Sequence, residues 1–248
     1  MFSRIAGLTL ACCLGMAPAA HAHLKDYLVN QDYYTAKRGE VEVALWNDMN
    51  FSEADNSDSY NSKHQVEVEF GVLDHLTLSY YEVYTWDREQ DWERDEFKVE
   101  AKLRFAEAGK WPVDLALYTE YKNPDGHRDV RSDEVENKII LSRDFGPWNV
   151  VGNFVFEREI NQHEEWKFEY TAGASYAVGA RTRVGLEVKE TLGNESEFGL
   201  RRDDHELYLV PGIYTSITPN MRLLVGPAFG LTEASDDLQL HSIIEYEF

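Results

Sequence analysis

The sequence predicts an all-β protein, an antiparallel up-and-down transmembrane β-barrel of about 12 strands with short periplasmic turns and longer acidic extracellular loops. Three observations predict this fold. The chain opens with an export leader, many of its stretches alternate apolar and polar residues, and the connections between those stretches alternate between short and long. A period of two is typical of strands with two different faces.

The first residues, "MFSRIAGLTLACCLGMAPAAHA", have the features of a secretory signal peptide. Arg4 supplies a positive charge, an apolar run follows from Ile5 to Met16, and small residues end at Ala22. We expect cleavage after Ala22, which removes residues 1–22. The run is shorter than the ~20 apolar residues that an uncleaved membrane anchor needs. A lipoprotein signal using Cys12 or Cys13 is the lesser alternative.

Composition excludes several classes of function. The chain carries 45 acidic and 24 basic residues, a formal net charge of −21, which argues against binding nucleic acid or attaching to the surface of anionic lipid. Both cysteines leave with the leader, so no disulfide is expected. An aromatic content of 13% and repeated Val, Leu, Tyr and Phe residues argue against disorder.

Twelve stretches show the strand pattern. They are residues 39–48, 63–72, 76–86, 96–105, 113–122, 135–143, 148–159, 167–176, 181–191, 205–215, 221–231 and 238–248. We therefore divide the exported chain into a periplasmic N-terminal segment, residues 23–39, and an outer-membrane β-barrel, residues 40–248. Each stretch alone is a weak signal, because soluble β proteins contain similar ones.

The connections give the stronger evidence. Short ones are expected at 73–75, 106–112, 144–147, 177–180 and 216–220, and longer ones at 49–62, 87–95, 123–134, 160–166, 192–204 and 232–237. This alternation is typical of a barrel with both termini on the short-turn side, which faces the periplasm in bacterial outer-membrane barrels. The sequence thus predicts a location in the bacterial outer membrane.

The two faces of the stretches suit two different solvents. One face is apolar, as in Val66, Val68 and Phe70. The other is charged and is expected to line the lumen: Glu67, Glu69, Lys98, Glu100, Lys102, Arg104, Asp114, Glu120, Glu157, Glu169, Arg183, Glu187, Lys189, Arg222 and Glu245. A soluble sandwich would also alternate, but its sheet edges would need protection. A closed barrel satisfies every backbone group, as hydrocarbon requires.

Tryptophan positions favour the membrane interpretation. Trp46, Trp86 and Trp166 lie at the long-loop ends of the stretches, and Trp111 and Trp148 lie at the short-turn ends. Aromatic residues gather at both interfaces of a bilayer. The sequence therefore predicts two aromatic belts.

The chain ends with "HSIIEYEF", which resembles the closing strand of outer-membrane barrels. Tyr246 and terminal Phe248 are similar to the signal that the barrel assembly machinery reads. The stretches "GPAFGLTEASDDLQLHSIIEYEF" and "HQVEVEFGVLDHLTLSYYEVY" also resemble transporter-type barrels linked to phenol-degradation meta-pathways. The resemblance implies passive transport of small molecules and carries no substrate.

Two interpretations of the lumen remain open. Nine acids face six bases among the predicted lumen residues, and rings of carboxylates favour cations. Alternatively, the bases pair with glutamates across strands and fill the interior. Barrels of about eight strands are filled and those of about sixteen leave a channel. We expect a passive channel for small neutral or cationic solutes. The alternative is a non-conducting structural or surface-interaction barrel with a plugged, charged lumen, and the third is a surface hydrolase.

No cofactor, dedicated metal site or catalytic group is expected. The acidic loops, such as "NFSEADNSDSYNS" and "NPDGHRDVRSDE", lack a calcium-loop spacing, so only weak association of divalent cations is expected there. The histidines show no paired ligand spacing, although His23 could chelate copper if cleavage makes it the N-terminal residue.

Two patterns bear on enzyme activity. "DDH" at 203–205 lies where omptin-type barrel proteases place acidic residues and histidine, but no partner acids can be identified. His241 and Ser242 are adjacent, so they face opposite sides of one strand and cannot pair. We therefore expect no enzyme. The expected partners are outer-membrane lipid, lipopolysaccharide and the barrel assembly machinery, with the oligomeric state open.

Overall fold

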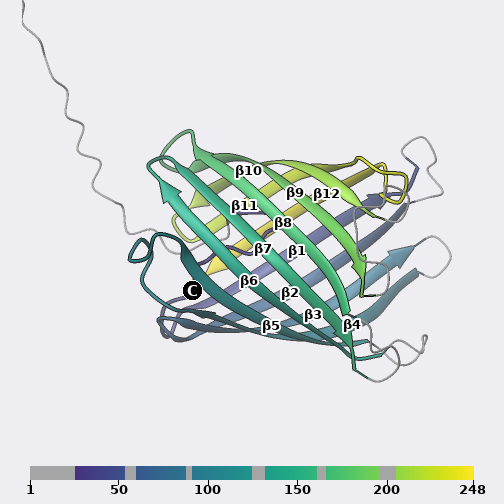
Figure 1. Ribbon diagram of the computed structural model, residues 1–248, viewed down its shortest axis with the longest axis horizontal. Coiled ribbons are helices and arrows are strands. Elements are labelled where there is room, and N and C mark those ends of the chain that lie inside the picture. The colour runs from purple at the N-terminus through teal and green to yellow at the C-terminus, as the bar shows by residue number, and fades with distance from the viewer. Residues whose placement is uncertain (1–25, 54–59, 88–90, 125–131, 161–165, 196–204) are drawn as a thin grey trace, which may run out of the picture.

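The computed structural model describes residues 26–53, 60–87, 91–124, 132–160, 166–195 and 205–248 as a barrel of twelve antiparallel strands (Figure 1). The strands are β1 (Val41–Phe51), β2 (Tyr60–Leu73), β3 (Leu76–Asp87), β4 (Asp91–Arg104), β5 (Asp114–Pro124), β6 (Glu134–Phe145), β7 (Trp148–Glu159), β8 (Trp166–Ala177), β9 (Thr182–Asn194), β10 (Leu207–Thr218), β11 (Met221–Gly230) and β12 (Leu238–Glu247). The expected signal peptide and His23 lie outside the described residues, as does much of the acidic loop sequence.

Closure of the sheet is made by the first and last strands. β1 pairs with β2 on one side and with β12 on the other, where Glu42 lies opposite Glu247 and Leu45 opposite Ile244. The seam extends to the chain end, because the Phe248 N–H donates to the Val41 carbonyl at 2.9 Å. The prediction of a closed antiparallel barrel of twelve strands is confirmed. None of the described residues forms a helix long and apolar enough to cross a bilayer.

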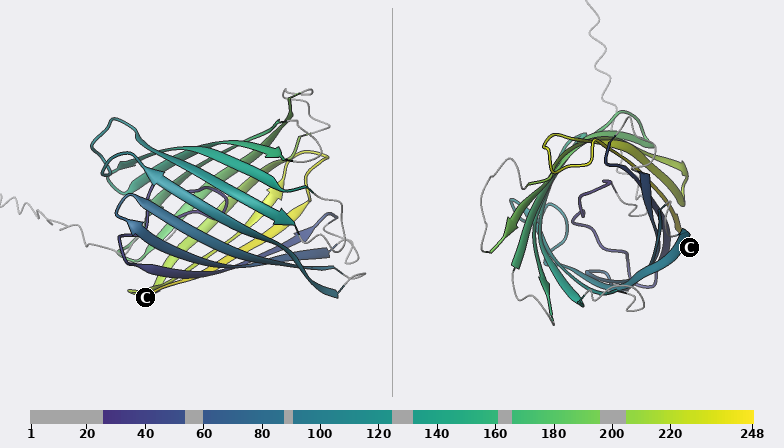
Figure 2. Two further views of the ribbon diagram at one scale, coloured as in Figure 1. Left: turned by 90° about the horizontal axis from the view of Figure 1, so that it is seen from below. Right: turned by 90° about the vertical axis from the view of Figure 1, so that its right-hand side faces the viewer.

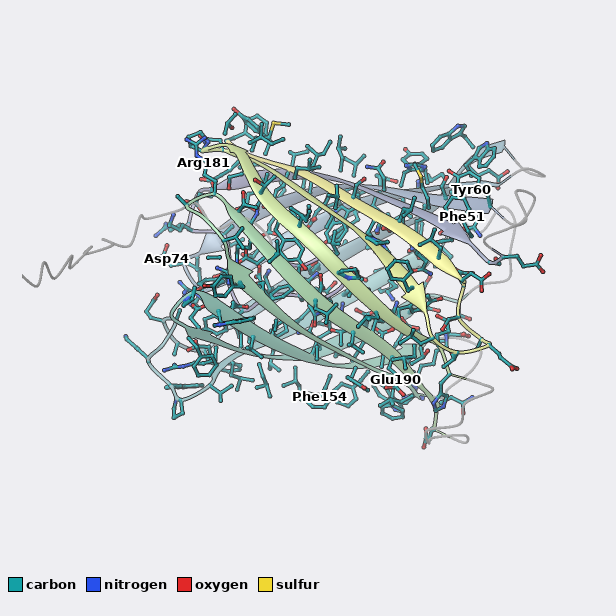
Figure 3. The ribbon with its side chains drawn as sticks, turned by 90° about the horizontal axis from the view of Figure 1, so that it is seen from above. Phe51, Tyr60, Asp74, Phe154, Arg181 and Glu190 are labelled. Carbon is teal, nitrogen blue, oxygen red and sulfur yellow. The ribbon has the colours of Figure 1, made fainter. Side chains whose placement is uncertain are left out.

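The two ends of the barrel differ in their connections. Asp74 and Arg181 lie at the end that carries both the start of β1 and the end of β12, and Phe51 and Tyr60 lie at the opposite end (Figure 3). The connections at the first end are 74–75, 105–113, 146–147, 178–181 and 219–220. We call this the short-turn end, and the other the long-loop end.

The expected long loop at 87–95 is wrong. β3 continues to Asp87 and β4 begins at Asp91, so only residues 88–90 lie between them. The strands extend because the pairing continues through the aromatic residues, with Trp86 opposite Trp92. Conversely, the connection 105–113 at the short-turn end is longer than a tight turn.

The outer surface of the wall is apolar. Side chains that alternate outward include Leu45, Phe70, Leu117 and Leu186, and Phe154 is 51% exposed and projects from the wall (Figure 3). Contact between water and such an apolar surface is unfavourable, whereas contact between the surface of a closed sheet and the hydrocarbon of a bilayer is favourable. Trp111 and Trp148 are exposed at the short-turn end, as the aromatic-belt prediction requires.

Trp46 contradicts that prediction. Its side chain points into the barrel, where the indole Nε1 donates to Glu67 Oε2 at 2.8 Å. The parity of β1 explains this, because Ala44 on the same face is buried and Leu45 on the other is exposed. Position near a strand end is therefore not enough to place a tryptophan at the interface.

The segment before β1 lies inside the barrel. Viewed down the axis, its trace runs within the ring of strands (Figure 2). Tyr27, Leu28, Tyr33 and Ala36 are buried. Residues 23–39 were predicted to be a periplasmic N-terminal segment, but the described part of it, residues 26–39, lies within the barrel at the short-turn end. We call residues 26–40 the inner segment.

The inward faces of the strands explain why the inner segment docks there. Beside the charged residues they carry an apolar cluster that includes Ile140, Val151, Val210 and Leu224, and this cluster packs against Tyr27 and Leu28. Burying one large apolar side chain is worth roughly 1.5–3 kcal/mol. The alternation analysis assigned only charged residues to the interior and did not find this cluster.

Candidate functional site in the barrel lumen

One carboxylate of β9 holds the inner segment by its backbone. Glu187 is 0% exposed, and its oxygens accept hydrogen bonds from the N–H groups of Leu28 at 2.8 Å, Val29 at 2.9 Å and Asn30 at 3.0 Å. The Asn30 amide and the Tyr214 hydroxyl donate to it as well, at 2.9 and 2.7 Å. A buried charge requires such partners, and hydrogen bonds to ionised groups are among the stronger ones.

Side chains of β7 and β8 fix the same stretch. The Tyr27 hydroxyl donates to Asn149 Oδ1 at 2.5 Å. Asn153 is bonded twice to Gln31, accepting its N–H at 2.7 Å and donating to its carbonyl at 2.9 Å. The inner segment is therefore bound by specific polar contacts as well as by apolar packing.

Two glycines of the wall leave space for the inner segment. A Cβ on Gly173 of β8 would lie 2.9 Å from the Tyr27 ring, and one on Gly226 of β11 would lie 2.3 Å from the Pro211 carbonyl oxygen of β10 and 2.7 Å from Leu28. All three distances are shorter than normal contacts between non-bonded atoms. Side chains at these two positions would collide with the inner segment.

The later part of the inner segment is bound to the turns. Thr35 Oγ1 donates to the Asp74 carbonyl at 2.9 Å, and the Ala36 N–H donates to Thr77 Oγ1 at 2.9 Å. The Tyr34 hydroxyl donates to Asp144 at 2.8 Å. Burial, together with the Asp144 charge, raises the pKa of Tyr34, so this phenol stays protonated and remains a donor.

Acidic residues of the inner segment also pair with bases predicted to line the lumen. Asp26 contacts Arg222 and lies 4.0 Å from Arg183 Nε. Asp32 Oδ1 lies 3.9 Å from Lys102 Nζ. Three of the predicted lumen bases therefore neutralise the inner segment and do not face open space.

The structure places all fifteen predicted lumen residues on the inward side of their strands. Those that are buried are Glu67, Glu69, Glu100, Lys102, Asp114, Glu120, Glu187, Arg222 and Glu245. Arg104 lies at the short-turn end and donates to the Asp74 carbonyl. Glu169 and Lys189 pair with each other at 3.4 Å. An inward-facing side chain does not necessarily line a path for solutes through the barrel.

The densest charge network includes Lys122, Glu136 and Lys138, which were not among the predicted lumen residues. Lys122 Nζ lies 2.8 Å from Glu136 Oε2 and 2.5 Å from Glu157 Oε2. Lys138 lies 2.7 Å from Glu136, and Lys98 lies 3.8 Å from Glu120. Parity alone could have found Lys122, because it continues the inward series of Asp114 and Glu120 on β5.

A cavity of about 160 Å³ lies between this network and the inner segment. Its lining joins residues 28–31 of the inner segment to Trp46, Gln65, Tyr81, Lys98, Tyr118, Glu120, Lys122, Glu136 and Lys138. The lysine amines are held in place, since Lys138 Nζ also lies 4.5 Å from the centre of the Tyr118 ring. The cavity is thus a polar chamber with fixed, largely paired charges.

A second acidic group lies under the cavity wall. The Tyr81 hydroxyl is 2.6 Å from Glu67 Oε1 and 2.5 Å from Glu100 Oε2. Trp46 bonds the other oxygen of Glu67. These two glutamates, both predicted to line a pore, are bound to aromatic side chains and are closed off from open space.

The histidines do not form a metal centre in the part of the chain that the structure describes. Within it, no group of three or more His, Cys, Asp or Glu residues is arranged to hold a metal ion. His205 is buried, while Asp203 lies outside the described residues. His241 points inward, with Nδ1 2.6 Å from Asp48 Oδ1, and Ser242 points outward toward Asn47.

No family model matches the chain, and no curated protein matches it. Solved structures do. The chain is similar to the COG4313 outer membrane channel from Pseudomonas putida F1, with a TM-score of 0.66 and 12% identity over 88% of this chain and 99% of that one. It is similar to the KdgM porin, with a TM-score of 0.57 and 8% identity over 84% and 99% of the two chains. It is also similar to the NanC porin, with a TM-score of 0.56 and 10% identity over 84% and 98%. These likenesses, at such low identity, show a shared fold alone, a closed antiparallel β-barrel.

Proposed function

We propose that the protein is a passive outer-membrane channel for small neutral or cationic solutes, narrowed at the short-turn end by the inner segment. The observation that carries the proposal is the inner segment itself, which Glu187 and Asn153 hold against the wall beneath a polar cavity. A cavity of about 160 Å³ is small beside the ≈ 300–1,000 Å³ of pockets that hold drug-sized ligands, which supports a small solute.

The charges around the cavity support the choice of solutes. Lys98, Lys122 and Lys138 each have a glutamate partner within 4.0 Å, so their amines are not free to attract anions. Acids outnumber bases nine to six among the predicted lumen residues. A neutral polar solute can exchange hydrogen bonds with such a lining, and a cation gains from the excess of carboxylates.

The fold supports the location. An apolar exterior around a closed wall needs a bilayer, and the solved structures that are similar in fold include an outer-membrane channel and two porins.

A non-conducting barrel is the second candidate, and the inner segment also favours it. The segment buries two tyrosines and a leucine and fills the short-turn end with bonded groups. If the segment never moves, the lumen is a structural core and the outer loops would carry the function.

Single-channel recording distinguishes the two. The refolded protein, with folding verified by heat-dependent gel mobility, is placed in a planar bilayer under a salt gradient. The channel proposal expects discrete, small, cation-favouring steps. A silent bilayer from folded protein would reject it. Glu100 and Glu187 are poor sites for testing selectivity, because they are 1% and 0% exposed. Glu136 and Lys122, which line the cavity, are better ones.

We also propose that the end of the chain guides assembly. The rings of Tyr246 and Phe248 meet edge to face, with their centroids 4.8 Å apart, on the outer side of the closing seam, and Phe248 is 74% exposed. Deleting Phe248 should lower insertion by the assembly machinery while leaving spontaneous refolding in detergent intact. An equal loss of assisted insertion and of spontaneous refolding would show that Phe248 stabilises the barrel and does not act as an assembly signal.

A further inference from the structure

A cluster of polar side chains interrupts the apolar outer surface near the long-loop end. Asn47 lies on β1, between the outward-facing Leu45 and Met49, and Ser62 and His64 lie on β2, before the outward-facing Val66. Polar groups on a wall that faces hydrocarbon are costly, and their presence in a membrane span is by itself a reason to look for a function.

These three side chains are connected in a line. His64 Nε2 lies 3.0 Å from Ser62 Oγ, and His64 Nδ1 lies 2.9 Å from Asn47 Oδ1. The strands produce this arrangement directly. Ser62 and His64 are two residues apart and so share a face, and Asn47 is paired opposite His64 in the β1–β2 register.

The asparagine fixes the state of the imidazole. Asn47 Nδ2 donates to Ser242 Oγ at 3.4 Å, which orients the amide so that Oδ1 faces His64. A carbonyl oxygen only accepts, so Nδ1 carries the proton and donates it. Nε2 is then left with a lone pair directed at the Ser62 hydroxyl, as a general base requires.

We propose that Ser62, His64 and Asn47 form a hydrolytic site on the outer face of the barrel, with Ser62 as nucleophile, His64 as general base and Asn47 as the positioning residue. Nucleophile, base and orienting group within hydrogen-bond reach define such a site on any fold. The site is separate from the lumen and does not depend on the proposed channel. It reverses the expectation that the chain has no catalytic group.

The surroundings identify the substrate class as acyl esters of membrane lipids. The site is flanked on the outer surface by Leu45, Met49 and Val66. Phe51 and Tyr60 lie farther along the same two strands, at the long-loop end (Figure 3). Aromatic residues at strand ends mark the boundary between headgroups and acyl chains, and the ester groups of lipids lie at that boundary. An amide as the third group avoids an ionised carboxylate at the lipid face, which would be costly.

The chemical steps follow from these roles. Ser62 Oγ attacks the ester carbonyl carbon and forms a new C–O bond while His64 Nε2 takes the hydroxyl proton. The ester C–O bond then breaks, and His64 returns the proton to the departing alcohol. Water, activated by His64, cleaves the acyl-serine, releases the fatty acid and restores the Ser62 hydroxyl.

Trp92 of β4 is the proposed cover of this site. Ser62 is 2% exposed, so a substrate must displace a neighbour to reach it, and the Trp92 ring lies 4.7 Å from that of His64 while being 62% exposed itself. An exposed indole at the rim of the site can swing aside with little loss of packing. Removing it should open the site.

A covalent probe tests the nucleophile directly. The refolded protein in mixed micelles is treated with an alkyl fluorophosphonate, and the modified residue is identified by peptide mass spectrometry. We expect modification at Ser62, faster in Trp92→Ala, absent in Ser62→Ala and strongly slowed in His64→Ala. Ser52→Ala, at an exposed serine that follows β1, is the matched control and should react like the wild type. Folded wild type and Trp92→Ala that both lack the modification would overturn the proposal.

Turnover measurements separate the two lipid sources and test Asn47. Fatty acid release is followed from phosphatidylcholine vesicles and from vesicles containing lipopolysaccharide, and release from either one supports the site and names the source. His64→Ala should lower kcat by about 10²–10⁴-fold. Asn47→Ala should lower kcat with KM unchanged, because it acts through His64. No release from either lipid by the Trp92→Ala protein would contradict the assignment.

Discussion

The Glu187 carboxylate of β9 accepts the backbone N–H of Leu28 at 2.8 Å, which joins residues 159 positions apart and fastens the inner segment within the lumen. Two neighbouring N–H groups bind the same carboxylate. This one buried acid therefore holds three consecutive residues of the inner segment.

Replacing Glu187 with Gln should release the inner segment. The variant removes the charge that three backbone N–H groups share, and each hydrogen bond to a charged group is worth about 1.5–3 kcal/mol. A loss of about 3 kcal/mol would raise the undocked fraction roughly a hundredfold. Ala36→Cys, a buried position, serves as the reporter, and its reaction with a soluble maleimide measures undocking.

Glu169→Gln is the control for that experiment. It removes an inward carboxylate of β8 that pairs with Lys189 of β9. The reporter should react with the control at the wild-type rate. Equal rates for the wild type and Glu187→Gln would show that Glu187 does not hold the segment.

Filling the space at Gly173 should have a similar effect without changing any charge. A valine there would collide with the Tyr27 ring, which lies 2.9 Å from the position of a Cβ. We expect faster labelling of the Ala36→Cys reporter and an unchanged barrel by gel mobility. Gly152→Val is the matched control, because a Cβ at Gly152 meets only a backbone oxygen at 3.9 Å. Identical labelling of both variants would contradict the docking geometry.

Lys122→Met should make the lumen more selective for cations. The amine lies between Glu136 and Glu157, and its loss leaves more uncompensated negative charge beside the cavity. The reversal potential under a salt gradient should move toward that of an ideal cation channel. Lys110→Met, in the exposed 105–113 connection, is the control and should leave the reversal potential unchanged. A shift of equal size in both variants would place the selectivity outside the cavity.

Two phenols of the inner segment should resist ionisation. Burial raises the pKa of Tyr27 and of Tyr34 above the ordinary value of about 10. Because the two pKa values are higher in the folded than in the unfolded state, the protonated phenols stabilise the fold fully below about pH 10. This contribution to stability is lost as the pH rises above that value. Absorbance at 295 nm near pH 11 should therefore be the same in the folded wild type and in folded Tyr27→Phe/Tyr34→Phe protein, whereas in urea the variant should show about two fewer phenolates than the wild type. Full ionisation in the folded barrel would contradict the buried positions.

Alternation allowed the wall to be predicted from the sequence because each strand has its own two faces. The twelve stretches, the ends of the barrel and the inward side of residues such as Glu120 and Glu187 all follow from parity within one strand. The pairing partners do not follow from it. Lys122 was missed although its parity was visible, because its importance comes from Glu136 and Glu157 on two further strands.

The inner segment could not be predicted, because it shows no period and its partners are distant in the chain. Tyr27 meets Asn149, and Leu28 meets Glu187, only after the barrel has closed. The site on the outer face left a clearer signal. Ser62 and His64 stand two residues apart in a strand whose outward positions are otherwise apolar, whereas the sequence analysis considered only the adjacent pair His241 and Ser242.

The most direct test of the account compares the unitary conductance of the wild type with that of a chain lacking residues 26–38. The inner segment narrows the lumen at the short-turn end, so the deletion should give a folded barrel with clearly larger cation-favouring steps. Equal conductance in the two proteins would contradict a lumen narrowed by the inner segment. Silence in both would reject the channel itself and leave the barrel as a scaffold for its outer surface.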